Sequence, residues 1–382
     1  MKTYSKLITY SLILFFSLSF YACEKEDNLP HFRNFHISTV YSATNDLLIQ
    51  APIPVIQEGQ NQVSTNTTQP AIVKFDGGNQ DPIEGYLFMP GTGDSQLNFV
   101  ILLHGSGGAL DGADDNTNAF TGKSSLTSQY ENWVDDLLAE GYGVFVINSF
   151  KGADRARING ESDYIGVKPP NDAPFTPYRV RAEDVKQGVA RLKGLVDHDN
   201  FNFVGDIALL GFSHGATAAI AAVHDYSHTQ IGGPEQMMEW SVKSSSIEYD
   251  GPDYDAPFSN QNTDVVAAIA YYGGTYGFGY FTDYAQGQGA AYKYQLNKHL
   301  MVHHGTSDNT VRIGSANSKW TPRGFENHIL QGNANQNIDF EFMEWQNASH
   351  SFDMPHKNAQ ADVNARNGAR TETLDFLDDY IG

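Results

Sequence analysis

Short apolar runs alternate along this chain with longer segments whose apolar residues recur at helical spacing. The short runs predict strands at Ala71–Phe75, Glu84–Met89, Asn98–Leu103, Gly143–Asn148, Asp206–Leu210, Asp264–Tyr271, His299–His303 and Asp339–Glu344. The helical spacing predicts helices at Ser124–Glu140, Tyr178–Val196, Ala216–Val223 and over much of Thr371–Ile381. Apolar strands that alternate with helices are typical of a mainly parallel central sheet with helices on both faces. The pattern therefore predicts the α/β fold class.

The region before the first predicted strand has a different composition. Within residues 1–22, Lys2 and Lys6 precede an apolar run from Leu12 to Phe16, and small residues follow. This layout is typical of an export signal, and the run is too short for a membrane-spanning helix. Residues 23–70 are rich in Asn, Gln, Ser and Thr, which predicts a tether and an irregular N-terminal segment. We expect one large domain over residues 71–382.

The chain contains a single cysteine, Cys23, directly after the predicted signal. One cysteine cannot build a disulfide framework, so the fold must be stabilised by its core. A cysteine at the end of a signal resembles the lipobox of bacterial lipoproteins, in which the thiol is acylated and becomes the new N-terminus. The resemblance implies a membrane anchor on Cys23 and an exported protein at the outer membrane or cell surface, with the periplasmic face as the alternative.

The charge of the chain argues against one class of partner. The sequence carries 45 Asp and Glu residues against 24 Lys and Arg, which gives a formal net charge of −21. Because so acidic a surface repels a phosphate backbone, we expect no nucleic acid as a partner. The same excess of acid keeps an exported protein in solution.

One stretch interrupts the alternation of strands and helices. Residues from about 225 to 263 are polar and contain Gly and Pro without clear periodicity. A loop this long inside a compact domain is usually functional or mobile. The sequence leaves two interpretations open, a lid over a site and a tolerated surface insertion.

The motif Gly211-Phe212-Ser213-His214-Gly215 lies between a predicted strand and a predicted helix. In G-x-S-x-G the serine occupies a strained strand-to-helix turn that only small neighbours permit. The turn presents the hydroxyl at the carboxyl edge of the sheet, where ligands bind in open α/β sheets. In this context the motif predicts an α/β-hydrolase fold with Ser213 as the nucleophile.

A serine hydroxyl needs a general base, and the base needs an acid that orients it. In α/β hydrolases the chain order is serine, then Asp or Glu, then His. Asp308 follows the penultimate predicted strand, and His350 is the first histidine after the last one. We therefore predict Asp308 as the acid and His350 as the base. A metal site of His303, His304 and Asp308 is a weaker alternative, because no second ligand cluster accompanies it.

The tetrahedral intermediate of acyl transfer needs hydrogen-bond donors for its oxyanion. One donor should be the backbone N–H of His214, the residue after the nucleophile. The other should come from the glycine-rich segment His104–Gly108, from the N–H of Ser106 with that of Gly107 as the alternative. Glycines there let the backbone approach a substrate carbonyl closely.

From about residue 70 to the C-terminus the chain resembles the dienelactone hydrolase family of α/β hydrolases. The motifs that carry the resemblance are Leu102–Gly108, Gly141–Val146 with Asn148–Phe150, Arg181–Asp184, Gly211–Gly215, Tyr271–Gly274, His304–Asp308 and Ala348–Asp353. The resemblance implies a triad of Ser213, Asp308 and His350, no metal, no organic cofactor, and a place for Tyr272 near the substrate pocket. Because dienelactone hydrolases proper use a cysteine nucleophile, the serine points to the serine esterase-like branch.

Together these features predict a serine hydrolase that cleaves carboxylic esters outside the cytoplasm through an acyl-enzyme on Ser213. The expected partner is an ester of a small molecule, a glycan or a polyester. One alternative is hydrolysis of small peptides or amides, because the catalytic domains of prolyl oligopeptidases share this triad order. The other is an inactive lipid-anchored binding protein on a hydrolase scaffold, against which the three intact triad positions argue.

Overall fold

The computed structural model describes residues 52–77, 82–91, 96–111, 119–151, 180–197, 202–223, 265–275, 298–315, 321–325 and 338–382. The predicted signal, Cys23, the first part of the predicted tether and the insertion at 225–263 lie outside these residues and stay predictions. The described chain from Ile53 onward belongs to one compact unit. No helix in the described ranges combines the length and the apolar character needed to cross a membrane.

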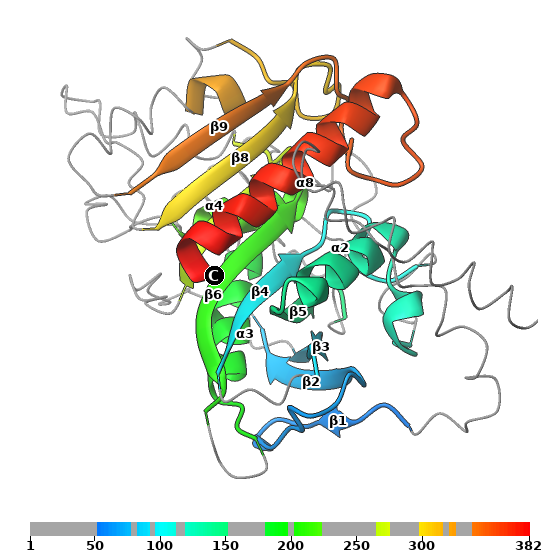
Figure 1. Ribbon diagram of the computed structural model, residues 1–382, viewed down its shortest axis with the longest axis vertical. Helices are drawn as coiled ribbons and strands as arrows, with labels where there is room; N and C mark the ends of the chain where they lie inside the picture. Colours follow the sequence, from blue (N-terminus) through cyan, green and yellow to red (C-terminus); the bar gives the residue numbers. More distant parts are fainter. Residues whose placement is uncertain are drawn as a thin grey trace, which may run out of the picture. The chain divides into compact units, whose positions relative to one another are not determined.

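Within the described residues, nine strands form one sheet in the order β1-β2-β3-β5-β4-β6-β7-β8-β9 (Figure 1). Their bounds are β1 Val55–Ile56, β2 Ala71–Asp76, β3 Pro82–Phe88, β4 Leu97–Leu103, β5 Gly143–Asn148, β6 Val204–Phe212, β7 Val265–Tyr271, β8 His299–Gly305 and β9 Phe340–Trp345. Strand β3 is antiparallel to both of its neighbours, and all other neighbouring strands are parallel. The predicted mainly parallel sheet is therefore confirmed.

Alternate residues of each strand enter two apolar cores, one on each face of the sheet. In β4, Phe99 and Ile101 belong to one core, whereas Val100 and Leu102 belong to the other. Helices α3 (Val180–Lys193) and α4 (His214–Ala222) cover the first core, and α2 (Ser128–Ala139) and α8 (Gln360–Ile381) cover the second. Figure 1 shows α2 and α8 on the near side of the sheet. This arrangement is an α/β-hydrolase fold, as the sequence predicts.

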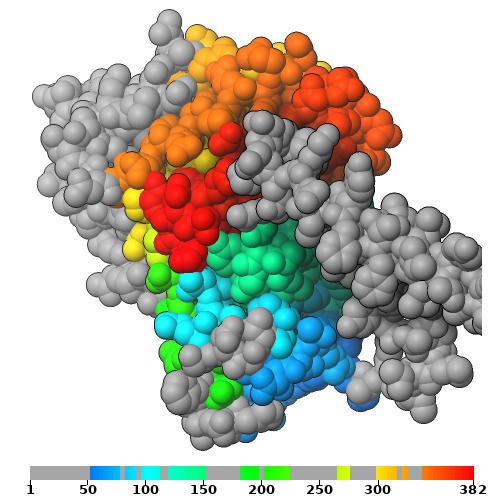
Figure 2. All heavy atoms as spheres, in the orientation of Figure 1, coloured from blue at the N-terminus to red at the C-terminus, as the bar shows by residue number. Residues whose placement is uncertain are grey.

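The predicted and observed elements differ mainly at their ends. Helix α8 begins at Gln360, well before the predicted Thr371. The pattern of apolar residues missed the first half of this helix because the residues buried there, such as Asp362 and Ala365, are small or polar. Gly368 lets this half pack closely, since a Cβ atom there would lie 2.5 Å from the ring of Trp345. The outer side of α8 forms part of the molecular surface (Figure 2). Hydrophobic spacing alone underestimates a helix whose buried face is made of small residues.

A chain of buried polar groups ties α8 to the sheet. Thr373 Oγ1 lies 2.7 Å from the hydroxyl of Tyr271 and 3.1 Å from Nε2 of His303. The indole N–H of Trp345 donates to Nδ1 of His303 at 3.2 Å, so the imidazole proton is on Nε2 and is donated to Thr373. Burial lowers the pKa of His303 to about 3, which keeps the ring neutral.

Strand β1 is an edge strand of the sheet, and Arg191 of α3 forms hydrogen bonds with the segment that follows it. Strand β1 pairs with β2 over two residues, Val55 with Ile72 and Ile56 with Val73. The Arg191 side chain donates hydrogen bonds to the carbonyl oxygens of Gln57, Gln60 and Lys74 and to the side-chain oxygen of Asn61. The segment that follows β1 is thereby fixed to both α3 and β2.

Candidate active site

Ser213 occupies a backbone conformation that side chains rarely adopt. Its φ of 52° and ψ of −114° place it at the junction between β6, which ends at Phe212, and α4, which begins at His214. A positive φ at a residue other than glycine persists only where its surroundings impose it. The N–H of Ser213 donates to the carbonyl of Tyr271 at 2.9 Å, so β7 holds the turn.

The two glycines of the motif are required by close backbone packing. A Cβ atom on Gly211 would lie 2.4 Å from the carbonyl oxygen of Gly215. One on Gly215 would lie 2.1 Å from the carbonyl oxygen of Leu103, at the end of β4. The turn therefore brings α4 directly against β4, and any side chain at these positions would separate the two elements.

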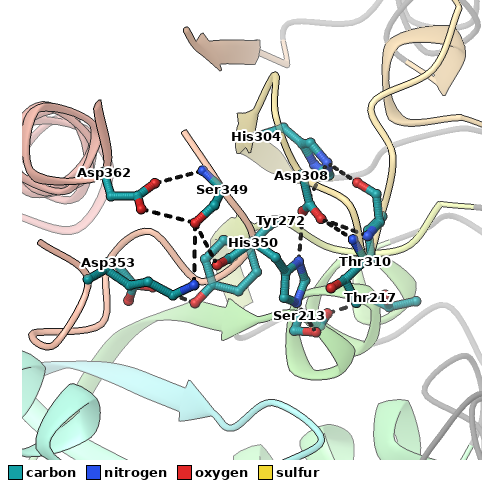
Figure 3. Close-up of polar contacts among 12 residues, drawn as sticks. Ser213, Thr217, Tyr272, His304, Asp308, Thr310, Ser349, His350, Asp353 and Asp362 are labelled. Atoms are coloured by element: carbon teal, nitrogen blue, oxygen red, sulfur yellow. Dashed lines mark hydrogen bonds and ion pairs between the residues drawn. The ribbon is translucent and has the colours of Figure 1, made fainter. Parts of the chain in front are cut away.

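The structure brings the three predicted triad residues into one hydrogen-bonded chain (Figure 3). His350 Nε2 lies 3.0 Å from Ser213 Oγ, and His350 Nδ1 lies 2.7 Å from Asp308 Oδ2. The residues follow β6, β8 and β9, so the carboxyl ends of these strands assemble the site. Because the carboxylate accepts a hydrogen bond from Nδ1–H, the imidazole proton is on Nδ1, and Nε2 is left with a lone pair directed at the serine hydroxyl.

A tight turn prepares Asp308 for this contact. Its Oδ1 accepts hydrogen bonds from the N–H groups of Thr310 and Val311, both at 2.8 Å. The Nε2–H of His304 donates to the carbonyl of Val311 at 2.8 Å and lies 3.5 Å from Asp308 Oδ2. Burial lowers the pKa of His304, so its ring is neutral. One carboxylate oxygen is thus used by the turn, and the other is left for His350.

The alternative metal site does not form. His303 points toward Thr373 of α8, and His304 is bonded to the carbonyl of Val311. In the described parts of the chain, no group of three or more His, Cys, Asp or Glu side chains is arranged to hold a metal ion. Asp308 is instead the partner of an imidazole.

The segments predicted to supply the oxyanion donors meet beside Ser213. His214 is the first residue of α4, and a Cβ atom on Gly105 would lie 3.5 Å from the Cβ of Ser213. The N–H of Gly105 donates to the hydroxyl of Tyr130 at 2.8 Å, and the N–H of Gly108 donates to the carbonyl of Gly105 at 3.2 Å. These two bonds shape the glycine-rich turn, and neither of them uses the N–H of Ser106.

The side chain of His214 is buried and contacts helix α3. Arg181, buried in α3, donates a hydrogen bond from its guanidinium to Nδ1 of His214 at 2.9 Å. Burial, then the charge of Arg181, lowers the pKa of His214 well below its usual range. The imidazole is therefore neutral with its proton on Nε2, and α3 supports the first turn of α4. Helical spacing does not reveal this contact, because it joins two different helices.

Tyr272, predicted near the pocket, lies against the imidazole of His350. The two ring centroids are 4.7 Å apart with an interplanar angle of 61°. Tyr272 is buried, and its hydroxyl contacts the carboxylate of Asp353 and the Nε2 of Gln129. Sequence patterns did not predict Asp353 or Gln129 as site residues, although Asp353 lies in the motif Ala348–Asp353 that contains His350.

Comparisons with known proteins give a distant likeness only. No protein-family model matches the chain, and no curated protein matches it. An esterase of the planctomycete Thermogutta terrifontis is 14% identical, with 80% of this chain and 90% of that protein covered and a TM-score of 0.47. A dienelactone hydrolase-like promiscuous phosphotriesterase from metagenomic libraries is 13% identical, with 82% and 99% covered and a TM-score of 0.46.

An esterase of Pyrococcus furiosus is 17% identical, with 84% of this chain and 99% of that protein covered and a TM-score of 0.43. Likeness at this level assigns neither a family nor an activity to the chain.

Proposed function

We propose that this protein is a serine hydrolase that cleaves carboxylic esters through an acyl-enzyme on Ser213. The observation that supports the proposal is the directed hydrogen-bond chain from Asp308 through His350 to Ser213, with contacts of 2.7 and 3.0 Å. A nucleophile in reach of a base, with the base oriented by a third group, is the arrangement that activates a serine hydroxyl. The resemblance to the serine esterase-like branch favours esters over amides as substrates.

The proposed reaction begins with attack of Ser213 Oγ on the carbonyl carbon of the ester. His350 Nε2 takes the hydroxyl proton, while Asp308 holds the Nδ1 proton and stabilises the imidazolium that forms. The backbone N–H groups of His214 and Ser106 donate to the oxyanion. His350 then protonates the leaving alcohol, and a water molecule that it activates releases the acid from Ser213. None of these steps requires a metal or an organic cofactor.

The test uses the purified protein, an aryl ester, the matched anilide and a fluorophosphonate probe. We expect hydrolysis of the ester and covalent labelling, both lost in Ser213→Ala with an unchanged melting temperature. Ser307→Ala is the matched control, because Ser307 is an exposed serine beside Asp308 and should keep full activity. Faster cleavage of the anilide would favour the amide alternative, and a protein that neither reacts nor labels would favour the inactive binding protein.

We also propose that the enzyme acts outside the cytoplasm as a lipoprotein anchored through Cys23. The support is the signal-like sequence of residues 1–22 and the position of the single cysteine directly after it. Its substrate would then be an ester that the exported domain meets, from a small molecule, a glycan or a polyester.

A further inference from the structure

A second buried carboxylate lies three residues after His350. Asp353 accepts hydrogen bonds from the hydroxyl of Tyr272, from Gln129 Nε2 at 2.7 Å and from Trp133 Nε1 at 3.4 Å. Burial raises the pKa of this carboxyl, and its three donors act in the opposite direction. A buried carboxylate needs such donors, because burial of an unpartnered charge is costly.

The direction of each hydrogen bond in this network follows from the groups involved. Gln129 Nε2 carries two hydrogens and lies 2.8 Å from the Tyr272 oxygen and 2.7 Å from Asp353 Oδ2. Because the Tyr272 oxygen accepts from Gln129, its own hydrogen is donated to Asp353 Oδ1. The hydroxyl is therefore held by α2 and by the loop that carries His350.

The other end of Tyr272 is held by the sheet. Its backbone has a φ of 45°, and its N–H donates to the carbonyl of His303 in β8 at 2.7 Å. In Figure 3 the phenol ring lies between Asp353 and the imidazole of His350. The edge-to-face contact at 4.7 Å is thus made by a ring whose backbone and hydroxyl are both fixed.

We propose that Tyr272 is a positioning residue that acts through His350, and that Asp353 and Gln129 hold it in place. The inference rests on the proposed function, because it requires His350 to be the base. The ring restricts the orientations of the imidazole, so that Nε2 stays directed at Ser213 while Nδ1 stays on Asp308. Misplacement of a reacting group by about 1 Å can cost about 10²-fold in rate.

The experiment compares two changes at Tyr272 with a control elsewhere in the core. Tyr272→Phe keeps the ring and removes the hydroxyl, whereas Tyr272→Leu removes the ring as well. Thr373→Val is the control, because it also deletes a buried hydroxyl between two side chains but lies on α8, with hydrogen bonds to Tyr271 and His303. For each protein we would measure kcat and KM for an aryl ester, the rate of fluorophosphonate labelling and the melting temperature.

We expect kcat and the labelling rate to fall together, about 10-fold for Tyr272→Phe and about 10²-fold for Tyr272→Leu, with KM unchanged. Thr373→Val should lower the melting temperature without a change in kcat. If a change at Tyr272 prevents folding, Gln129→Met tests the same network. It removes the amide that donates to Tyr272 and Asp353 and leaves the phenol ring in place. A lower kcat at unchanged KM in this variant supports the inference.

The inference would be overturned if the folded Tyr272 variants kept the kcat and the labelling rate of the wild type. The same holds for Gln129→Met if the Tyr272 variants do not fold. The proposed function would stand in either case, because the unaltered protein would still be labelled at Ser213. No labelling of the unaltered protein would overturn the proposed function, and this inference with it. The two failures are therefore distinguishable.

Discussion

Gly215 lies so close to Leu103 that a Cβ atom on the glycine would be 2.1 Å from the leucine carbonyl oxygen. Both atoms belong to regular elements, α4 and β4, so rotation of a side chain cannot relieve the overlap. We expect Gly215→Ala to lower the free energy of unfolding by about 3 kcal/mol or more and to abolish ester hydrolysis. Urea unfolding and an ester assay would measure both effects.

The control for this prediction is Gly194→Ala. A Cβ atom at Gly194 would lie 3.5 Å from the carbonyl oxygens of Ala190 and Arg191, an ordinary contact. Its free energy of unfolding should stay within about 0.5 kcal/mol of the wild-type value. Equal stability of the two variants would contradict the close packing of α4 on β4.

A second prediction concerns the acid of the triad. Asp308→Asn keeps the shape of the side chain, and its amide oxygen can still accept from the N–H groups of Thr310 and Val311. It removes the charge that fixes the proton on Nδ1 of His350, so kcat for an aryl ester should fall by about 10⁴-fold. The melting temperature should change little. Near-wild-type turnover would mean that another carboxylate orients the base.

A third prediction follows from the buried neutral His303. Burial lowers its pKa to about 3, whereas in the unfolded chain a histidine has a pKa of about 6.5. The unfolded state therefore binds more protons between these values, and the free energy of unfolding falls as pH drops from 6.5 toward 3. The loss from this residue is at most about 1.4 kcal/mol per pH unit.

His303→Gln removes the titrating group and places an amide near the position of Nε2. Urea unfolding from about pH 8 down to pH 4.5 should then show a shallower decline below pH 6.5 than in the wild type. The raised pKa of Asp353 acts in the opposite direction, but it is common to both proteins and cancels in the comparison. Identical slopes would show that His303 does not contribute to acid sensitivity.

A fourth prediction tests the proposed anchor. The mature protein should begin at Cys23 with thioether-linked lipid and should sediment with membranes, whereas Cys23→Ala should move to the soluble fraction. Each buried methylene contributes about 0.8 kcal/mol, so several acyl chains would hold the enzyme firmly. Intact-mass measurement of the native protein decides the matter, because an unmodified N-terminus would identify a freely exported hydrolase.

The sequence predicts the sheet and the positions of the triad residues because both depend on local patterns. Each strand is a short apolar run, and Ser213, Asp308 and His350 each follow such a run in the expected order. The carboxyl ends of parallel strands meet at one edge, so order along the chain is enough to predict proximity.

The network behind the imidazole could not be predicted in this way. Gln129 and Tyr272 are 143 residues apart, and Gln129 and Asp353 are 224 residues apart. No local pattern links a glutamine on a helix to an aspartate in a later loop, because their contact depends on how α2 packs on the sheet. The contact between Arg181 and His214 depends in the same way on the packing of α3 beside α4.

Arg191 also determines how the domain would bear mechanical load. A pull on the chain that precedes Ile53 reaches the domain first at β1, whose pairing with β2 covers only two residues and would separate easily. The bonds from Arg191 to the segment after β1 and to Lys74 carry that force into α3 and β2. Ser213, Asp308 and His350 follow β6, β8 and β9, in the other half of the strand order. In an enzyme tethered by its N-terminus, a pull at the anchor would therefore pass into α3 and β2 before it reached the strands that the triad residues follow.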